Sequence, residues 1–130
     1  MQGRDAMMGA IEKDVNYPDS ELYRKAFRLA LYTHELTTGS SEADRQSLAP
    51  DMVESAMAIP SSIANGCRAR SVRAVRANLI IAFSKCGRLE CQLSLFHDLK
   101  YIGTGDYKKV LALEEDVSGT LLRMITEVKV

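Results

Sequence analysis

The chain has 130 residues, of which 46% are hydrophobic, and its 17 basic and 17 acidic side chains give zero net charge. This length suits one domain that buries a core without disulfides or a metal ion, and the composition excludes a disordered chain. Zero net charge excludes a uniformly basic surface but leaves open where the charges lie.

Four segments show the apolar spacing of an amphipathic helix, and almost none shows the alternation of a strand. The first helix is predicted from about residue 19 to residue 37, with Asp19 as its N-cap. A polar, turn-like segment, residues 38–47, follows it. The second helix is predicted over residues 48–65. Pro60 should kink this helix rather than end it, because the apolar period continues beyond the proline.

The third helix is the longest, and it follows a natural helix stop at Gly66. Counted from Val72 as position a, its a and d positions are apolar for four heptads, which predicts a helix of about 28 residues. Ser71 is its expected N-cap. The a and d residues are Val72, Val75, Leu79, Ala82, Cys86, Leu89, Leu93 and Phe96.

The fourth helix is predicted to begin near Thr104 or Asp106, and its apolar stripe continues to Val128. Residues 1–15 are expected to form an N-terminal tail or a short extra helix, so the domain should span residues 16–130. Four amphipathic helices joined by short polar connections predict an all-α fold, an antiparallel up-down-up-down four-helix bundle.

The third helix also has apolar residues outside its a and d positions. They lie at b, c and e positions, which face water in a monomeric bundle, and they widen the apolar arc well beyond one stripe. Two interpretations remain open: a broad core contact with two neighbouring helices, or the interface of a homo-oligomer. The residues concerned are Ile80, Ile81, Phe83 and Leu95.

Two polar residues of the third helix, Glu90 and Gln92, lie at e and g positions, beside the seam formed by its a and d residues. If partly buried, they need hydrogen-bond partners on an adjacent helix, such as Tyr23, Arg24 or Arg28. We favour a structural polar network over a ligand site at these positions.

The chain lacks the sequence motifs of common catalytic, metal and cofactor sites. Di-metal bundles place a Glu three residues before a His, but Leu31 and Ser94 stand at those positions before His34 and His97. The sequence has no Cys/His cluster, no nucleotide-binding glycine loop and no nucleophile elbow. We therefore expect no enzymatic activity, no metal, no cofactor and no small-molecule substrate.

The sequence also predicts where in the cell the protein is located. Its longest uncharged run, residues 55–67, is shorter than the ~20 apolar residues of a membrane span. Residues 1–15 contain five charged residues and lack the apolar run of a signal peptide. The three cysteines, Cys67, Cys86 and Cys91, are an odd number without a C-x-x-C pair. We therefore expect a reduced cytoplasmic protein without a membrane partner.

Positive charge is concentrated in one part of the chain. Residues 55–89 contain six basic residues and no acidic residue, whereas the rest holds 11 basic and 17 acidic residues. A cluster at the turn between the second and third helices could bind the phosphates of RNA or another nucleic acid. The cluster consists of Arg68, Arg70, Arg73 and Arg76. The alternative is a solvated basic end that meets the acidic residues 114–116 of a neighbouring helix or subunit, and the lack of interleaved aromatic residues favours it.

Several short motifs resemble those of a known family, in the same order and spacing. Residues 59–66, IPSSIANG, resemble its I-P-S-N-I-A-E-G, and residues 89–93, LECQL, resemble its L-E-x-Q-L. Residues 98–102, DLKYI, resemble its D-L-G-Y-L, and residues 23–26, YRKA, stand where it has W-x-K-A. From about residue 16 onward the chain is therefore similar to the bacterial four-helix-bundle proteins encoded in intervening sequences of 23S rRNA genes.

The resemblance implies a four-helix bundle that assembles into a homopentameric ring and has no established enzymatic activity. The family is related to the accessory variability proteins of diversity-generating retroelements, which associate with nucleic acid, and this relation implies an RNA or nucleic-acid role by analogy. The chain departs from the family at Asp51, Val53 and Glu54, where basic residues are usual. The acidic residues lower the positive charge of that surface.

Overall fold

The structure, a computed structural model, describes residues 20–38 and 43–128. Across these residues it contains four helices and no strand, so the predicted all-α four-helix bundle is confirmed. The predicted tail, residues 1–15, lies outside the described residues. The helices are α2 (Glu21–Thr38), α3 (Ala43–Cys67), α4 (Val72–Asp98) and α5 (Thr104–Glu127).

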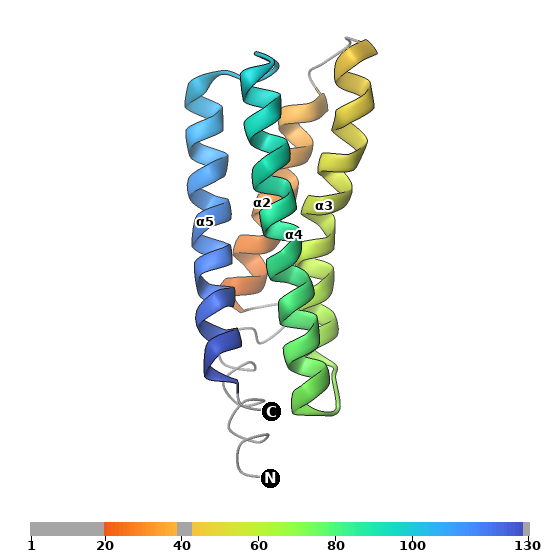
Figure 1. Cartoon of the computed structure of the whole chain (residues 1–130), viewed down its shortest axis with the longest axis vertical. Helices are drawn as coiled ribbons and strands as arrows, with labels where there is room; N and C mark the ends of the chain where they lie inside the picture. The colour runs from red at the N-terminus through yellow and green to blue at the C-terminus, as the bar shows by residue number, and fades with distance from the viewer. Residues whose placement is uncertain (1–19, 39–42, 129–130) are drawn as a thin grey trace.

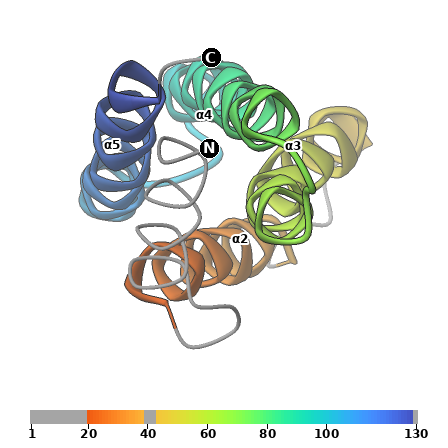
Figure 2. The ribbon, with the colours of Figure 1, turned by 90° about the horizontal axis from the view of Figure 1, so that it is seen from below.

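The four helices lie side by side, and each runs opposite to its neighbour in the chain (Figure 1). Contacts between α2 and α5 agree with this direction, because Lys25 meets Asp116 whereas the later residue Tyr32 meets the earlier Asp106. Seen along the bundle axis, α2 lies diagonally opposite α4, and α3 lies opposite α5 (Figure 2). Each helix therefore packs mainly against two neighbours.

The core runs along the whole bundle and takes apolar side chains from all four helices. In α4, every a and d residue from Val75 to Phe96 is buried, as the heptad pattern predicts. Burying one such side chain stabilises the fold by about 1.5–3 kcal/mol, so this seam is a major source of stability. No helix in the described ranges is both long and apolar enough to cross a bilayer.

A serine side chain caps the N-terminus of two of the helices. At α2 the Tyr23 amide donates to Ser20 Oγ at 3.0 Å, so Ser20 caps this helix. The predicted cap, Asp19, lies outside the described residues. At α4 the Ala74 amide donates to Ser71 Oγ at 3.1 Å, which confirms the predicted cap.

Helix α3 is longer than the sequence predicts. Residues 43–47 belong to the helix rather than to a turn, and the helix ends at Cys67 rather than stopping at Gly66. Pro60 lies inside the helix without ending it, as predicted. Gly66 is buried, and a Cβ there would lie 3.5 Å from Asn78 Cβ, so this glycine faces α4. Packing of the apolar stripe against α2 and α4 outweighs the local helix-breaking signals.

The turn between α4 and α5 contains a left-handed residue. Lys100 has φ 66°, and among the described residues it is the only one other than glycine with positive φ. Its amide donates to the His97 carbonyl at 2.9 Å, and the Tyr101 amide donates to the Phe96 carbonyl at 3.0 Å. The Tyr101 and Phe96 rings also meet edge to face at 5.2 Å. These contacts form a Schellman motif with its accompanying apolar contact.

Candidate functional site

The outward side of α4 carries exposed apolar side chains. Ile80, Ile81 and Leu95, here called the α4 outer face, are 40%, 47% and 46% exposed. They lie at b and c positions of the heptad, and the neighbouring helices leave them uncovered. Phe83 is different, because it is half-buried and packs against the core. Core packing accounts for Phe83 but not for the other three residues.

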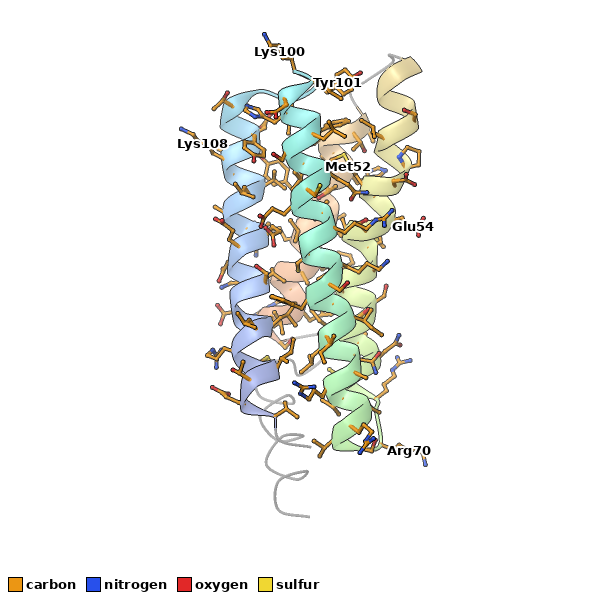
Figure 3. All side chains as sticks on the ribbon, viewed as in Figure 1. Met52, Glu54, Arg70, Lys100, Tyr101 and Lys108 are labelled. Atoms are coloured by element: carbon orange, nitrogen blue, oxygen red, sulfur yellow. The ribbon has the colours of Figure 1, made fainter. Side chains whose placement is uncertain are left out.

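The predicted arginine cluster lies at one end of the bundle. Figure 3 shows Arg70 at the lower end, where α3 turns into α4. Backbone hydrogen bonds from Arg68 to Asn65 and from Ala69 to Gly66 hold this turn, at 3.2 and 3.1 Å. Arg68, Arg70 and Arg73 are exposed, and Arg76 is half-buried. The structure therefore brings the four arginines together on one end of the molecule.

The acidic run of α5 does not face this basic end within the subunit. Asp116 pairs with Lys25 of α2 at 2.8 Å, and Lys25 also pairs with Glu21 at 3.1 Å. The hydrogen bonds that Lys25 donates to Asp116 and Glu21 raise the pKa of Lys25. Glu115 is exposed, and Glu114 is turned into the bundle. Among the described ion pairs of the subunit, none joins this acidic run to the arginine cluster.

A buried carboxyl group lies between α4 and α5. Glu114 is only 1% exposed, and its Oε1 has no hydrogen-bond partner in the described part of the chain. Burial and then interaction with Glu90 raise the pKa of Glu114 to about 8, although a hydrogen bond with Ser118 opposes the shift. The same environment, burial first and then the charges of Glu114 and Glu90, raises the pKa of Cys86 to about 12.

We did not predict this carboxyl pair from the sequence. The signal was present, because Glu114 stands four residues after Val110 and three before Val117, on the apolar stripe of the fourth helix. A carboxyl group within the apolar stripe of a helix is buried, so it needs either a polar partner or a proton. The neighbour of Glu114 is Glu90.

The predicted partners of Glu90 and Gln92 on α2 are not their neighbours. Glu90 interacts with Glu114 of α5. Gln92 is half-buried, and its Oε1 lacks a partner within residues 20–38 and 43–128. Helix α2 lies diagonally opposite α4 (Figure 2), and Arg24 and Arg28 are exposed on it rather than turned into the bundle.

The described residues offer no cluster of metal ligands. Within the two described ranges, no three His, Cys, Asp or Glu residues gather closely enough to hold a metal ion. His97 stacks on Tyr107 at 4.3 Å, and its Nε2 lies 3.2 Å from Thr104 Oγ1. These contacts fix His97 across the turn that joins α4 to α5.

Comparison with sequence models of protein families gives a match to the 23S rRNA-intervening sequence protein over residues 18–123. The chain belongs to this family. A crystal structure of a protein of unknown function from the S23 ribosomal protein family of Bacteroides thetaiotaomicron VPI-5482 has the same fold. It is 18% identical, with a TM-score of 0.75, and the match covers 81% of this chain and 95% of that chain. A search of curated proteins gives no match.

Membership of the 23S rRNA-intervening sequence protein family confirms the resemblance carried by the short motifs. The matched region contains the α4 outer face, the arginine cluster and the Glu90–Glu114 pair. All three features therefore lie within the matched region.

Proposed function

We propose that this protein is a non-enzymatic, self-associating four-helix bundle that serves as a homo-oligomeric scaffold or interaction module in the cytoplasm. The observation that carries the proposal is the α4 outer face, where three large apolar side chains are 40–47% exposed. Clusters of exposed apolar side chains commonly mark protein interfaces. The family resemblance supports a pentameric ring as the form of the assembly.

The cytoplasmic location is supported by the cysteines. Cys67, Cys86 and Cys91 carry thiols rather than disulfides, as expected of a chain in a reducing compartment. Cys86 is buried at an a position, and burial raises the pKa of its thiol, so it serves as a small core residue rather than a nucleophile.

The test is the molar mass of a variant with a charge on the α4 outer face. Ile81→Glu places a carboxylate on a side chain that is 47% exposed, so the single subunit should tolerate it. If the face is an interface, the variant dissociates to the subunit mass of 14.4 kDa, because a desolvated unpaired charge opposes association. Lys108→Glu, on the exposed surface of α5, is the control and should leave the assembly intact. An unchanged assembly of the Ile81 variant would exclude this face.

A second candidate function is the binding of RNA or another nucleic acid by Arg68, Arg70, Arg73 and Arg76. The observation that favours it is their gathering at one end of the bundle, in a stretch without acidic residues. Glu54, one of the acidic departures from the family, lies on the upper half of α3 and far from Arg70 (Figure 3). Glu54 therefore does not lower the positive charge around Arg70.

Titration with a labelled RNA at two salt concentrations tests this second function. Phosphate-driven affinity should fall steeply as salt rises, and each arginine removed should reduce the slope by about one. The double variant Arg70→Ala, Arg73→Ala should bind more weakly at low salt. The control Lys108→Ala, Lys109→Ala removes two charges from α5, near the opposite end. Equal effects of the two double variants would exclude a specific role for the cluster.

A further inference from the structure

Helix α2 carries a second exposed apolar surface. Phe27 and Leu31, one turn apart, are 42% and 51% exposed. The Tyr23 ring stacks on Phe27 with a centroid distance of 6.1 Å, and Arg24 and Arg28 line the same surface. Within the described ranges, neither arginine belongs to an ion pair. These five residues line a shallow open hollow on α2, and we call them the α2 ridge after the exposed Phe27 and Leu31 side chains.

A groove lies on another side of the bundle, between α4 and α5. It has room at Gly87, where an added Cβ would meet no atom within 4 Å. Its charged lining residues are acidic, Glu90 and Asp98, and no lysine or arginine of the described ranges lines it. The α4–α5 groove is defined here by Gly87, Glu90, Leu95, Asp98, Tyr107 and Leu111.

The α2 ridge and the α4–α5 groove are complementary in charge and in chemistry. The ridge presents two arginines beside two apolar side chains, and the groove presents two carboxylates beside Leu95 and the α5 wall. Below Glu90, the buried Glu114 has an oxygen without a hydrogen-bond partner in the described chain. A guanidinium group satisfies paired carboxyl groups well, because it offers several donors in a planar fork.

One copy of the chain cannot bring its own ridge into its own groove. Helix α2 lies diagonally opposite α4, so the bundle itself separates the two surfaces (Figure 2). The arginines of the ridge can therefore reach the groove carboxylates only on a second molecule. Leu95 belongs both to the groove and to the α4 outer face, whereas Ile80 and Ile81 lie about 20 Å farther along the helix.

We propose that the α2 ridge of one copy docks into the α4–α5 groove of a second copy, with Arg24 and Arg28 facing Glu90 and Asp98. This inference rests on the proposed self-association and names the two surfaces that meet. Because these surfaces differ, the contact is heterologous, and an open assembly always keeps one unused ridge at one end and one unused groove at the other. Such contacts continue until they close into a ring or extend as a filament.

Two variants, each lacking one surface, test this arrangement. Arg28→Glu with Leu31→Glu destroys the ridge at two exposed positions. Gly87→Leu with Asp98→Arg fills the groove and reverses its charge, and the open space at Gly87 allows the subunit to accept the larger side chain. We expect each variant alone to be a monomer of 14.4 kDa by light scattering. Mixed in equal amounts, they should form a heterodimer of twice that mass and nothing larger, because the mixture contains one working ridge and one working groove.

Matched controls show whether an effect comes from the surface that is altered or from the kind of substitution that is made. Lys109→Glu with Ala112→Glu makes the same change of charge at exposed positions of α5. Gly119→Leu adds the same side chain at another exposed glycine with open space around it. Both controls should assemble as the unmodified chain does. Circular dichroism verifies the fold of each variant, and Leu31→Gln and Asp98→Asn replace any variant that fails to fold.

The outcomes distinguish this inference from the proposed function. If the unmodified chain is a monomer, self-association is wrong and the inference falls with it. If the unmodified chain assembles but the two monomeric variants do not combine, self-association stands and the pairing of ridge with groove is wrong. Continued assembly of either variant alone also overturns the pairing. A 1:1 heterodimer supports it, since contacts between identical surfaces give no such complementation.

Discussion

Glu114 of α5 is buried beside Glu90 of α4, and this neighbour adds to the burial that raises the pKa of Glu114 to about 8. At neutral pH the Glu114 carboxyl is therefore mainly protonated in the folded chain. When protonated, the Glu114 carboxyl can donate a hydrogen bond to the Glu90 carboxylate. The protonation also removes the repulsion between two neighbouring carboxylates.

This pair predicts that stability falls as pH rises. The folded pKa of Glu114 lies above its ordinary value of 4.5, so the folded state holds the proton more tightly than the unfolded state. The stabilisation is complete below the unfolded pKa and is lost as pH rises through about 8. The loss is at most about 1.4 kcal/mol per pH unit. Urea unfolding at pH 6 and pH 8.5, at one subunit concentration, measures it.

The control for this pH effect is Glu114→Gln. Its amide can donate to Glu90 as the protonated acid does, but it does not titrate. The variant should therefore show a smaller change in the free energy of unfolding between the two pH values. An equal change in both proteins would show that other groups cause the dependence.

A second prediction concerns the left-handed residue in the turn between α4 and α5. Lys100 adopts φ 66°, where a side chain costs about 1 kcal/mol relative to glycine. The related motif D-L-G-Y-L has a glycine at this position. Lys100→Gly should therefore raise the free energy of unfolding by about 1 kcal/mol, as measured in urea. Lys100→Ala also removes the charge but keeps the Cβ, so an equal gain from alanine would contradict this explanation.

A third prediction separates the core side of α4 from its outer face. Leu93 is fully buried, and Leu95, two residues later, is 46% exposed. Leu93→Ala should lower the free energy of unfolding by about 2–5 kcal/mol through the lost contacts and the cavity. Leu95→Ala should cost the subunit fold only about 0.5 kcal/mol. Thermal and urea unfolding of both variants check this, and similar losses would mean that the two faces are assigned wrongly.

A fourth prediction concerns the cap of α4. Ser71 Oγ accepts the Ala74 amide, and the first turn of the helix contains no acidic residue that would also favour its N-terminus. Ser71→Ala should cost about 0.5–2 kcal/mol of stability. Ser84→Ala, at an exposed position within the same helix, serves as the reference and should cost little. The cap assignment fails if the two substitutions have the same effect.

The heptad seam of α4 was predictable, because Val75 to Phe96 follow one period without a polar interruption. The start of α3 was not, because residues 38–47 are polar, and the helix extends back to Ala43 despite Pro50. Local signals describe the isolated chain, whereas tertiary packing decides how far a helix continues.

The surfaces of the bundle also have features that the sequence predicts and features that it does not. Sequence spacing placed Ile80 and Ile81 outside the seam, and the structure leaves both exposed. The neighbour of Glu90 could not be predicted, because that required knowing that α5, and not α2, lies beside it. Heptad positions specify the side of a helix that a residue occupies, but only the arrangement of the bundle specifies what that side meets.

The molar mass of the unmodified chain in dilute solution tests the central claim most directly. Multi-angle light scattering during gel filtration gives this mass independently of molecular shape. Self-association predicts a mass that is a whole multiple of the 14.4 kDa subunit, and five subunits if the family ring is formed. A single species of 14.4 kDa at micromolar concentration would contradict the account.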